Sequence, residues 1–252
     1  MRNGYFPIFS KGRVLKKESI EYLRDFPYDL ASLACENYSD GILFGFSITS
    51  CGDGQIHISK GVLKYQSDII VIPDQVSEMN ESDYGVFLYT KMVVGEPHET
   101  VDCMIRNVEL VIDRREVNAG NEIELGRFCL HRGAVLRCVY DSFADLRTPN
   151  DTMDLTRVPF AGYGAPSLHP VVIKEYAKAL LTISRDPADT SFALMCMNTG
   201  VMHKGCIQWH IAKKTNKDYA DFTLPMLYDK LLSLLPQSGI KGVVGPRRTS
   251  IL

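Results

Sequence analysis

The alternation of apolar and polar positions between residues 40 and 73 predicts a group of β-strands. Every second residue of the first strand is apolar: Ile42, Phe44, Phe46 and Ile48. Such a two-residue period is typical of a half-buried strand. Residues 51–54 (Cys-Gly-Asp-Gly) accept positive φ, so the chain can reverse there, and residues 55–60 alternate again. Apolar runs at 62–65 and 69–72 follow on either side of a polar tip. The stretch therefore predicts an antiparallel meander that serves as a scaffold.

The segment before the meander predicts an arm and a helix. Residues 1–16 carry three aromatic side chains, Tyr5, Phe6 and Phe9, and predict an extended arm that packs on its own domain or reaches a neighbouring subunit. Residues 17–38 have helical spacing, with Ile20 and Leu23 on one face. Pro27 favours a first helical turn, so we expect this helix in two pieces.

Further strands are expected up to about residue 140. Apolar residues alternate over 84–94, 100–113 and 122–130, with turn residues between these runs and a turn at Gly95-Glu-Pro97. No crossover helix long enough for a parallel βαβ unit lies between them. The segment 40–140 therefore predicts an antiparallel β domain, built as a sandwich or in a barrel-like form.

The composition changes near residue 140. Residues 141–166 are rich in Asp, Asn, Pro and Gly, which predicts an irregular linker. From residue 167 the apolar period becomes helical, with Pro170 in a first turn and breaks expected near Gly200 or Gly205. Residues 167–252 thus predict a helical region with a basic, glycine-rich tail. The fold class expected for the whole chain is α+β, with 1–39 as the arm and helix.

Composition excludes few functions, but it bears on nucleic-acid and membrane binding and on the compartment in which the protein is made. The chain has 252 residues and a formal net charge of −2, which gives no global footprint for nucleic acid or an anionic membrane. Its seven cysteines have wide spacings and no CxxC, so they are expected to be reduced and to behave as small hydrophobes. No signal peptide or membrane span is evident, and we expect the protein to be made in the cytoplasm.

Two groups of residues are candidates for metal sites. Cys196, His203, Cys206 and His210 are ligand types that zinc accepts, and Cys206 and His210 share one face of a helix. Against zinc, Cys196 and His203 have no familiar ligand spacing, and neighbouring methionines are typical of core. The acidic residues Asp141, Asp145, Asp151 and Asp154 lack the spacing and central glycine of a calcium loop, so a solvated loop is favoured. No metal or cofactor is expected.

Motifs typical of enzymes are missing from the sequence. It contains no GxxxxGK[ST], GxGxxG, GxSxG or HExxH, although a catalytic triad assembled from distant residues stays open. Trp209 and the tyrosines are able to line a carbohydrate surface, but single aromatic residues at helical positions are mostly core. The sequence favours a protein that is not an enzyme.

Three segments together resemble a family of phage-tail proteins. The first is the meander, at Gly41-Ile42, Gly45, Ser59-Lys-Gly61 and Ile69-Ile70. The second is residues 121–137, NEIELGRFCLHRGAVLR, followed by Asp141 and Phe143; the third begins at Asn150, NDTMDLTRVPFAGYGAPSLHPVVIKEYA. The order of these segments, from Asp40 to Tyr176, is similar to that of baseplate and tail-fibre-connecting structural proteins of Gram-positive prophages and phage-tail-like bacteriocins (tailocins). One departure is Gln66-Ser67, which replaces a hairpin glycine, so that turn must be of another type.

The resemblance implies a structural subunit at the baseplate or tail-fibre attachment region of a contractile or siphophage-like tail, and it carries over no catalytic residue. Its implied partners are other tail or baseplate proteins and the tail fibre, within an oligomeric particle. Such a protein would assemble in the bacterial cytoplasm and end in the virion or tail-like particle. Interface candidates are aromatic residues of the arm and of the 158–164 loop and the last residues of the basic tail: Tyr5, Phe6, Phe9, Phe160, Tyr163, Ile251 and Leu252.

Two alternatives from other classes remain open at this stage. One is a carbohydrate- or ligand-binding β module with a helical appendage. The other is a cytosolic metal-dependent enzyme that uses the Cys196–His210 region. A tail subunit should self-assemble or co-purify with tail proteins, a binding module should bind glycans as a monomer, and a zinc enzyme should carry stoichiometric metal.

Overall fold

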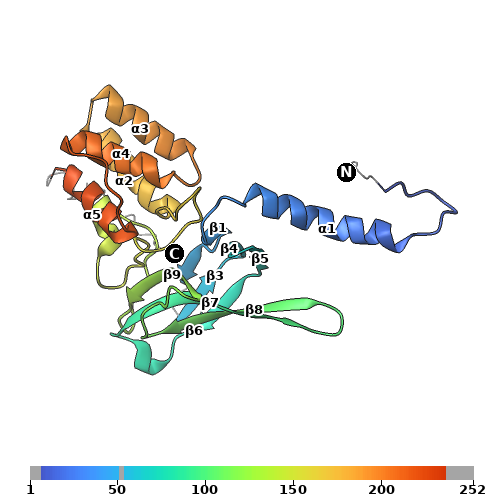
Figure 1. Ribbon diagram of the computed structural model, residues 1–252. Helices are drawn as coiled ribbons and strands as arrows, with labels where there is room; N and C mark the ends of the chain where they lie inside the picture. Colours follow the sequence, from blue (N-terminus) through green and yellow to red (C-terminus); the bar gives the residue numbers. More distant parts are fainter. Residues whose placement is uncertain (1–6, 51–53, 237–252) are drawn as a thin grey trace.

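The computed structural model describes residues 7–50 and 54–236, and over these ranges the chain is α+β, as predicted. Helix α1 (Lys17–Ala34) projects from a body that contains antiparallel strands and a group of C-terminal helices (Figure 1). The predicted residues Tyr5, Phe6, Ile251 and Leu252, and the turn at Cys51, lie outside the described ranges.

Helix α1 is one continuous helix of 18 residues, which corrects the expectation of two pieces. Pro27 lies inside it, where its missing N–H removes one bond of the helical ladder. Within the described ranges, none of the α1 residues is buried. The helix therefore keeps its form without a core face of its own.

The predicted meander is bent and divided between two sheets. Strands β1 (Gly41–Gly45), β4 (Gly61–Tyr65) and β5 (Asp68–Ile72) form one sheet, in the order β1-β4-β5. Strands β2 (Ile48–Ser50), β3 (Gln55–Ile58) and β6 (Gln75–Glu78) form the second, in the order β2-β3-β6. The pairing is antiparallel throughout, as predicted, but the single strand expected through Ile48 is broken.

The break is a corner at Gly45 and Phe46. Gly45 has a φ of +78° and Phe46 a φ of 57°, both in the left-handed region. A Cβ on Gly45 would lie 2.1 Å from the carbonyl oxygen of Lys60. The Phe46 ring covers Gly61, where a Cβ would lie 2.4 Å from the ring. The chain thus turns from one sheet into the next because glycine allows two backbones to meet and Phe46 fills the space above them.

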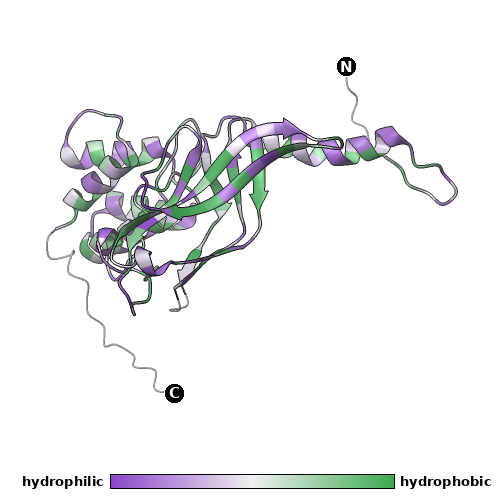
Figure 2. Cartoon of the chain, turned by 90° about the horizontal axis from the view of Figure 1, so that it is seen from below, coloured by the Kyte–Doolittle hydropathy of each residue, from purple (hydrophilic) through white to green (hydrophobic). Residues whose placement is uncertain are grey.

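The third sheet is the longest and has the order β8-β7-β9. It contains β7 (Phe87–Glu99), β8 (Met104–Asp113) and β9 (Glu122–Cys129). The turn predicted at Gly95-Glu-Pro97 is not formed, since β7 continues past it with a register shift between Val94 and Pro97. The paired ends of β7 and β8 project from the body on the same side as α1 (Figures 1 and 2).

The first half of the central strand β7, residues 88–92, is buried on both faces and carries a charged side chain inside. Lys91 is 0% exposed, and its Nζ lies 2.9 Å from Asp113 Oδ1 and 3.5 Å from Glu122 Oε2. Burial opposes ionisation of Glu122, but hydrogen bonds from Arg115 and the Asn118 N–H, with the charge of Lys91, outweigh it and lower the pKa of that carboxyl. The lysine is tolerated there because two carboxylates on neighbouring strands compensate its charge.

The segment expected as an irregular linker is irregular, but it is largely buried. It contains a 3₁₀ helix, η2 (Phe143–Arg147), and isolated bridges such as Phe160 with Ser167; a shorter 3₁₀ helix, η1 (Glu81–Asp83), precedes β7. Its core side chains are Phe143, Leu146, Met153, Leu155, Val158 and Phe160. These residues belong to one hydrophobic cluster that also includes residues of the sheets and of the C-terminal helices.

The C-terminal helices agree with the helical period seen in the sequence. They are α2 (Pro170–Ile183), α3 (Pro187–Asn198), α4 (Lys204–Thr215) and α5 (Leu224–Leu234). The break between α3 and α4 includes Gly200, as predicted, and α2 has its proline in the first turn. Tyr228 of α5 donates a hydrogen bond of 3.0 Å to the carbonyl of Phe143, which ties the helices to the irregular segment.

Candidate interaction surfaces

The first candidate surface is an apolar stripe on α1. Its large side chains recur every three or four residues and are between 48% and 69% exposed: Ile20, Leu23, Phe26, Leu30 and Leu33. Pro27 and Ala34 fall on the same face at this spacing. We call these seven residues the α1 stripe. In the described part of the chain, α1 lies near strand β5, but none of the α1 residues is buried and the stripe stays about half exposed or more.

The opposite face of α1 is polar, and charged residues on it form ion pairs with one another. Lys17 lies 3.3 Å from Glu21, and Arg24 lies 2.6 Å from Asp25. Figure 2 shows both apolar and polar residues along the helix. An amphipathic helix of this kind is stabilised mainly by packing of its apolar face, and exposure of that face indicates a docking surface.

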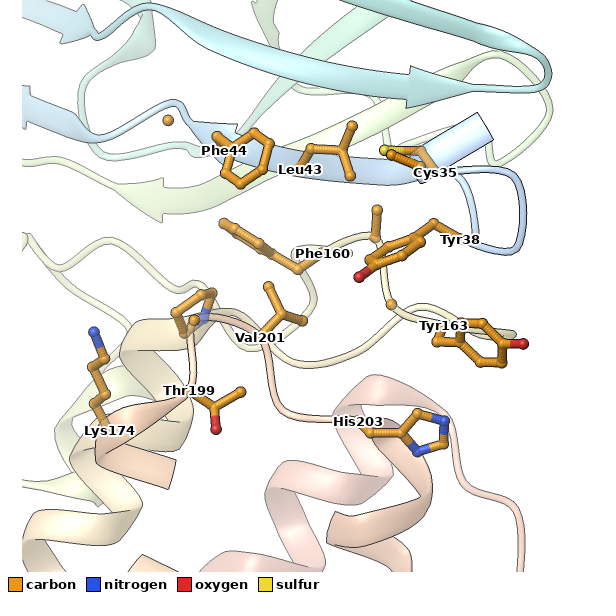
Figure 3. A pocket seen from close by; sticks show the side chains of 16 residues that line it. Cys35, Tyr38, Leu43, Phe44, Phe160, Tyr163, Lys174, Thr199, Val201 and His203 are labelled. Carbon is orange, nitrogen blue, oxygen red and sulfur yellow. The ribbon is translucent and has the colours of Figure 1, made fainter. Parts of the chain in front are cut away.

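The second candidate surface is a groove of about 730 Å³ beside the C-terminal end of α1. Its walls come from the end of α1, strand β1, residues 160–163 and the α3–α4 connection (Figure 3). The aromatic and aliphatic side chains that line it include Tyr38, Leu43, Phe44, Phe160, Tyr163 and Val201. We call this cavity the groove. Because its lining is mostly apolar, it suits hydrophobic side chains better than a polar reaction.

The rim of the groove is held together by backbone and ring contacts. Tyr38 and Tyr163 form an antiparallel bridge, and their ring centroids lie 6.4 Å apart in an edge-to-face arrangement. Ala161 N donates a 2.8 Å hydrogen bond to Ile42 O, which fixes residues 160–163 against β1. The two basic side chains at the rim are Lys174 and His203 (Figure 3). His203 Nδ1 accepts a hydrogen bond from Gly205 N, so this histidine serves as the N-cap of α4.

The predicted interface residues that the structure describes fall into two places. Phe160 and Tyr163 both line the groove, although Phe160 is 5% exposed and packs edge-to-face on His169, whereas Tyr163 is 59% exposed. Phe9 is exposed and lies before α1, at the far end of that helix from the groove. Sequence reasoning recognised the helical spacing of the α1 segment, but it did not propose the α1 stripe, Phe44 or Tyr38 as interface residues. The three- and four-residue spacing through Leu33 was a signal that could have identified the stripe.

The four residues considered for zinc are engaged in other contacts or exposed. His210 stacks on Phe192 with ring centroids 3.9 Å apart, and its Nε2 lies 2.9 Å from the Tyr176 hydroxyl. Burial lowers the pKa of His210 to about 4 and raises the pKa of Cys196 to about 12. Cys206 is exposed on α4. A thiol held protonated is a poor zinc ligand. Across residues 7–50 and 54–236, no group of three or more His, Cys, Asp or Glu side chains is placed to hold a metal.

The acidic residues of the irregular segment accept hydrogen bonds from protein groups. Asp145 is bound by Arg137, and Asp151 Oδ1 accepts a 2.7 Å hydrogen bond from His131 N. Burial opposes ionisation of Asp145, but the bonds from Arg137, Asp141 N and Thr148 outweigh it and lower the pKa of this carboxyl. Asp154 accepts from Thr156 N. These carboxylates organise the irregular segment through hydrogen bonds to its own groups.

Comparison with known proteins gives a loose structural likeness. No family model matches the sequence, and no curated protein matches it. A chain of the type VI secretion system TssK-TssF-TssG baseplate subcomplex is similar with a TM-score of 0.43 and 10% identity, covering 91% of this chain and 98% of that one. A crystal structure of TssK is similar with a TM-score of 0.43 and 8% identity, covering 94% of this chain and 72% of that one. TssK from T6SS EAEC in complex with a nanobody is similar with a TM-score of 0.41 and 11% identity, covering 90% of this chain and 100% of that one. These values are too low to assign a function. Among the described helices, none is long and apolar enough to cross a membrane.

Proposed function

We propose that this chain is a structural subunit of a phage tail or phage-tail-like particle, at the baseplate or tail-fibre attachment region, and that it works through protein–protein interfaces. The observation that carries the proposal is α1, an amphipathic helix whose apolar stripe is exposed along its whole length. A helix of this kind gains its stability from a partner.

The placement in a tail or contractile injection system is supported by the sequence. The three segments between Asp40 and Tyr176 resemble baseplate and tail-fibre-connecting proteins in their order. In the structure the same segments supply the corner at Gly45, strand β9 and one wall of the groove. The proposed partners are other tail or baseplate proteins and the tail fibre, with several copies of the chain in the particle.

A role other than catalysis is part of this proposal. His210, Cys196 and Asp145, which the sequence offered as chemical groups, are occupied in packing and hydrogen bonds. The two candidate surfaces are apolar. Their chemistry favours docking of side chains.

Sedimentation of a lysate tests the proposal. The tagged chain is expressed in a bacterium that makes the particles, these are separated by sedimentation, and each fraction is analysed by mass spectrometry. We expect the chain in the fraction that contains sheath- and tube-sized particles, together with tail proteins. A chain found entirely as a free protein, while tail particles sediment without it, would contradict the proposed function.

The groove favours a second candidate, a ligand-binding module. Tyr38, Phe44 and Tyr163 place aromatic faces around a cavity whose size suits a small ligand or a sugar. Glycan binding to the purified chain, measured on an array and repeated with Tyr163→Ala, tests this alternative. Binding that Tyr163→Ala removes would support it, and an array without binding would exclude carbohydrate as the ligand.

A further inference from the structure

Helix α1 lacks the features that would make it stable alone in water. It has 18 residues, an internal Pro27 and no side-chain hydrogen bond at its N-cap, Lys16. Most of the stability of a helix in a protein comes from packing of its apolar face, and an internal proline costs about 3 kcal/mol. No α1 residue is buried in the part of the chain that is described, so the described residues do not supply the missing packing and the face is open to another molecule.

The pattern of the α1 stripe indicates that its partner is another helix. Ile20, Leu23, Pro27, Leu30 and Ala34 alternate at three and four residues, the spacing with which two helices interlock. Phe26 and Leu33 widen this seam on one side. The same spacing on a second copy of the chain would match it.

The charges near α1 indicate that two copies would lie antiparallel. Several charged residues have no ion-pair partner among the described residues: Lys11, Arg13 and Lys16 before the helix, Glu18 in its first turn, and Asp29 and Glu36 near its end. Glu18 is favoured where it is by the helix dipole. An antiparallel pair places the basic group of one copy beside the acidic end of the other, whereas a parallel pair places like charges together.

An antiparallel pair also brings the arm of one copy to the groove of the other. A helix of 18 residues is about 27 Å long at about 1.5 Å per residue. The groove opens at Ala34 and Cys35, at the end of α1 that joins the body. The arm, residues 7–16, leaves from the opposite end and exposes the apolar side chains Ile8, Phe9, Val14 and Leu15. In an antiparallel pair these side chains therefore reach the partner's groove.

The area available is enough for a stable dimer. Each large side chain of the stripe or the arm is about half exposed or more. Each therefore has roughly 100 Å² of solvent-accessible surface that a partner can bury. Five from the stripe and four from the arm give about 1,800 Å² in a symmetric pair, within the usual range of about 1,200–2,000 Å² for specific interfaces. The stripe alone gives about 1,000 Å², which is below that range, so burial of the arm is needed for a stable pair.

We propose that two copies of this chain associate through antiparallel pairing of their α1 stripes, with the arm of each copy in the groove of the other. The inference rests on the proposed function, because a second copy of the chain is then the partner of the α1 stripe. The contact is isologous, so the same residues serve both copies. Other subunits of the particle would then meet a preformed dimer.

The mass of the purified full-length chain in solution is the first test. We expect sedimentation equilibrium to give a dimer. Leu23→Gln with Leu30→Gln keeps helix propensity while removing apolar area from the stripe, and should weaken association at least 100-fold. Tyr28→Gln is the matched control, because Tyr28 is exposed on the polar face, and it should leave the dimer within about twofold. A monomer at every concentration, a larger oligomer, or equal effects of stripe and control would overturn the proposal.

Cross-linking tests the orientation. Ser19→Cys places a new thiol 16 residues before Cys35, about 24 Å away along a helix, which a short bis-maleimide does not span within one copy. We expect a link from the thiol at position 19 of one copy to Cys35 of the other, identified by mass spectrometry of the linked peptides. Links that join position 19 of both copies, or Cys35 of both copies, would indicate a parallel pair and overturn the antiparallel arrangement.

A double-mutant cycle tests the arm in the groove. Phe9→Ser and Phe44→Ser should each weaken the dimer about tenfold, and the double variant should weaken it less than the product of the two. If the double variant weakens the dimer by the product of the two single effects, Phe9 and Phe44 do not contact each other across the dimer, and the arm does not lie in the groove. Particle sedimentation separates this inference from the proposed function, since a monomeric chain that still sediments with tail particles would contradict only the dimer.

Discussion

At the scale of single residues, the sharpest constraint is the corner where β1 passes into β2. Gly45 meets the Lys60 carbonyl at a distance that leaves no space for a Cβ, and its φ of +78° is one that other residues rarely adopt. Steric conflict with backbone is costly because backbone cannot rotate away as a side chain can. Glycine at this position is therefore a requirement of the two-sheet arrangement.

We expect Gly45→Ala to lower the free energy of unfolding by about 3 kcal/mol or more, because strain and overpacking add. Gly133→Ala is the control, since Gly133 has a φ of +80° and nothing within 4 Å of its added Cβ. It should lower the free energy of unfolding by only about 1–2 kcal/mol. Urea denaturation measures both. Equal effects would show that the crowding at Gly45 is not what sets its cost.

Two partly buried histidines, His169 and His210, predict a pH dependence of the free energy of unfolding. Burial lowers the pKa of His169 to about 3 and that of His210 to about 4. Between these values and about 6.5, the unfolded chain binds protons that the folded chain does not, so the free energy of unfolding falls as pH decreases through this window. The slope is at most about 1.4 kcal/mol per pH unit for each histidine.

Replacement of His169 by Asn should reduce that slope. His169 Nδ1 accepts a hydrogen bond from Val171 N at the start of α2, and an Asn side chain can accept the same bond. The free energy of unfolding of His169→Asn, measured by urea denaturation from pH 6.5 to pH 4, should therefore change less with pH than that of the unaltered chain. An unchanged slope would mean that His169 is protonated in the folded state.

At the scale of elements, local pattern accounts for more of the structure than long-range packing does. The helical period from Pro170 to Leu235 and the alternation over 122–130 predicted α2 to α5 and β9. The corner at Phe46 was not predicted, because the alternation of apolar residues continues through it and its cause is close packing against the distant Lys60 and Gly61. The extension of β7 past Pro97 depends on its pairing with β8, which local pattern does not reveal.

The candidate surfaces also divide into residues that local sequence suggests and residues that only the fold brings together. Tyr163 and Phe9 were proposed because they are aromatic residues in segments expected to be irregular or extended, and the structure shows both exposed. The groove was not proposed, since its walls come from residues 34–45, 160–174 and 199–203, which only the fold brings together. The exposure of the α1 stripe also depends on which elements reach it, and an amphipathic pattern alone does not give that.

Substitution of Pro27 tests whether α1 is independent of the body. Pro27→Ala restores one backbone donor and should stabilise α1 by about 3 kcal/mol, so amide hydrogen exchange within α1 should slow by about 100-fold in dilute protein. The free energy of unfolding of the body should stay within about 0.5 kcal/mol, because α1 buries no residue in the described chain. A larger change in the body would show that α1 packs against it.

At the scale of the whole molecule, the strands, the irregular segment and the C-terminal helices share one hydrophobic cluster. Phe143 illustrates this, since its ring lies 5.3 Å from that of Tyr176 in α2 and 4.8 Å from that of Tyr228 in α5. A shared core of this kind transmits a local loss of packing to the entire body. The projecting α1 and the paired ends of β7 and β8 lie outside it (Figure 1).

Tyr228→Phe tests this coupling. The substitution leaves the carbonyl of Phe143 without its buried hydrogen bond and should cost about 1–3 kcal/mol. Far-UV circular dichroism, which reports the helices, and tyrosine fluorescence should shift together to a lower urea midpoint. Two separate transitions would show that the sheets and the C-terminal helices unfold independently.

The most direct test of the account is the distribution of three forms of the chain between particles and free protein in a lysate. The unaltered chain and Tyr28→Gln should sediment with tail particles, and Leu23→Gln with Leu30→Gln should remain in the soluble fraction although its body is folded. That result would establish the exposed face of α1 as the surface through which the chain is assembled. Equal sedimentation of all three forms, or of none, would contradict it.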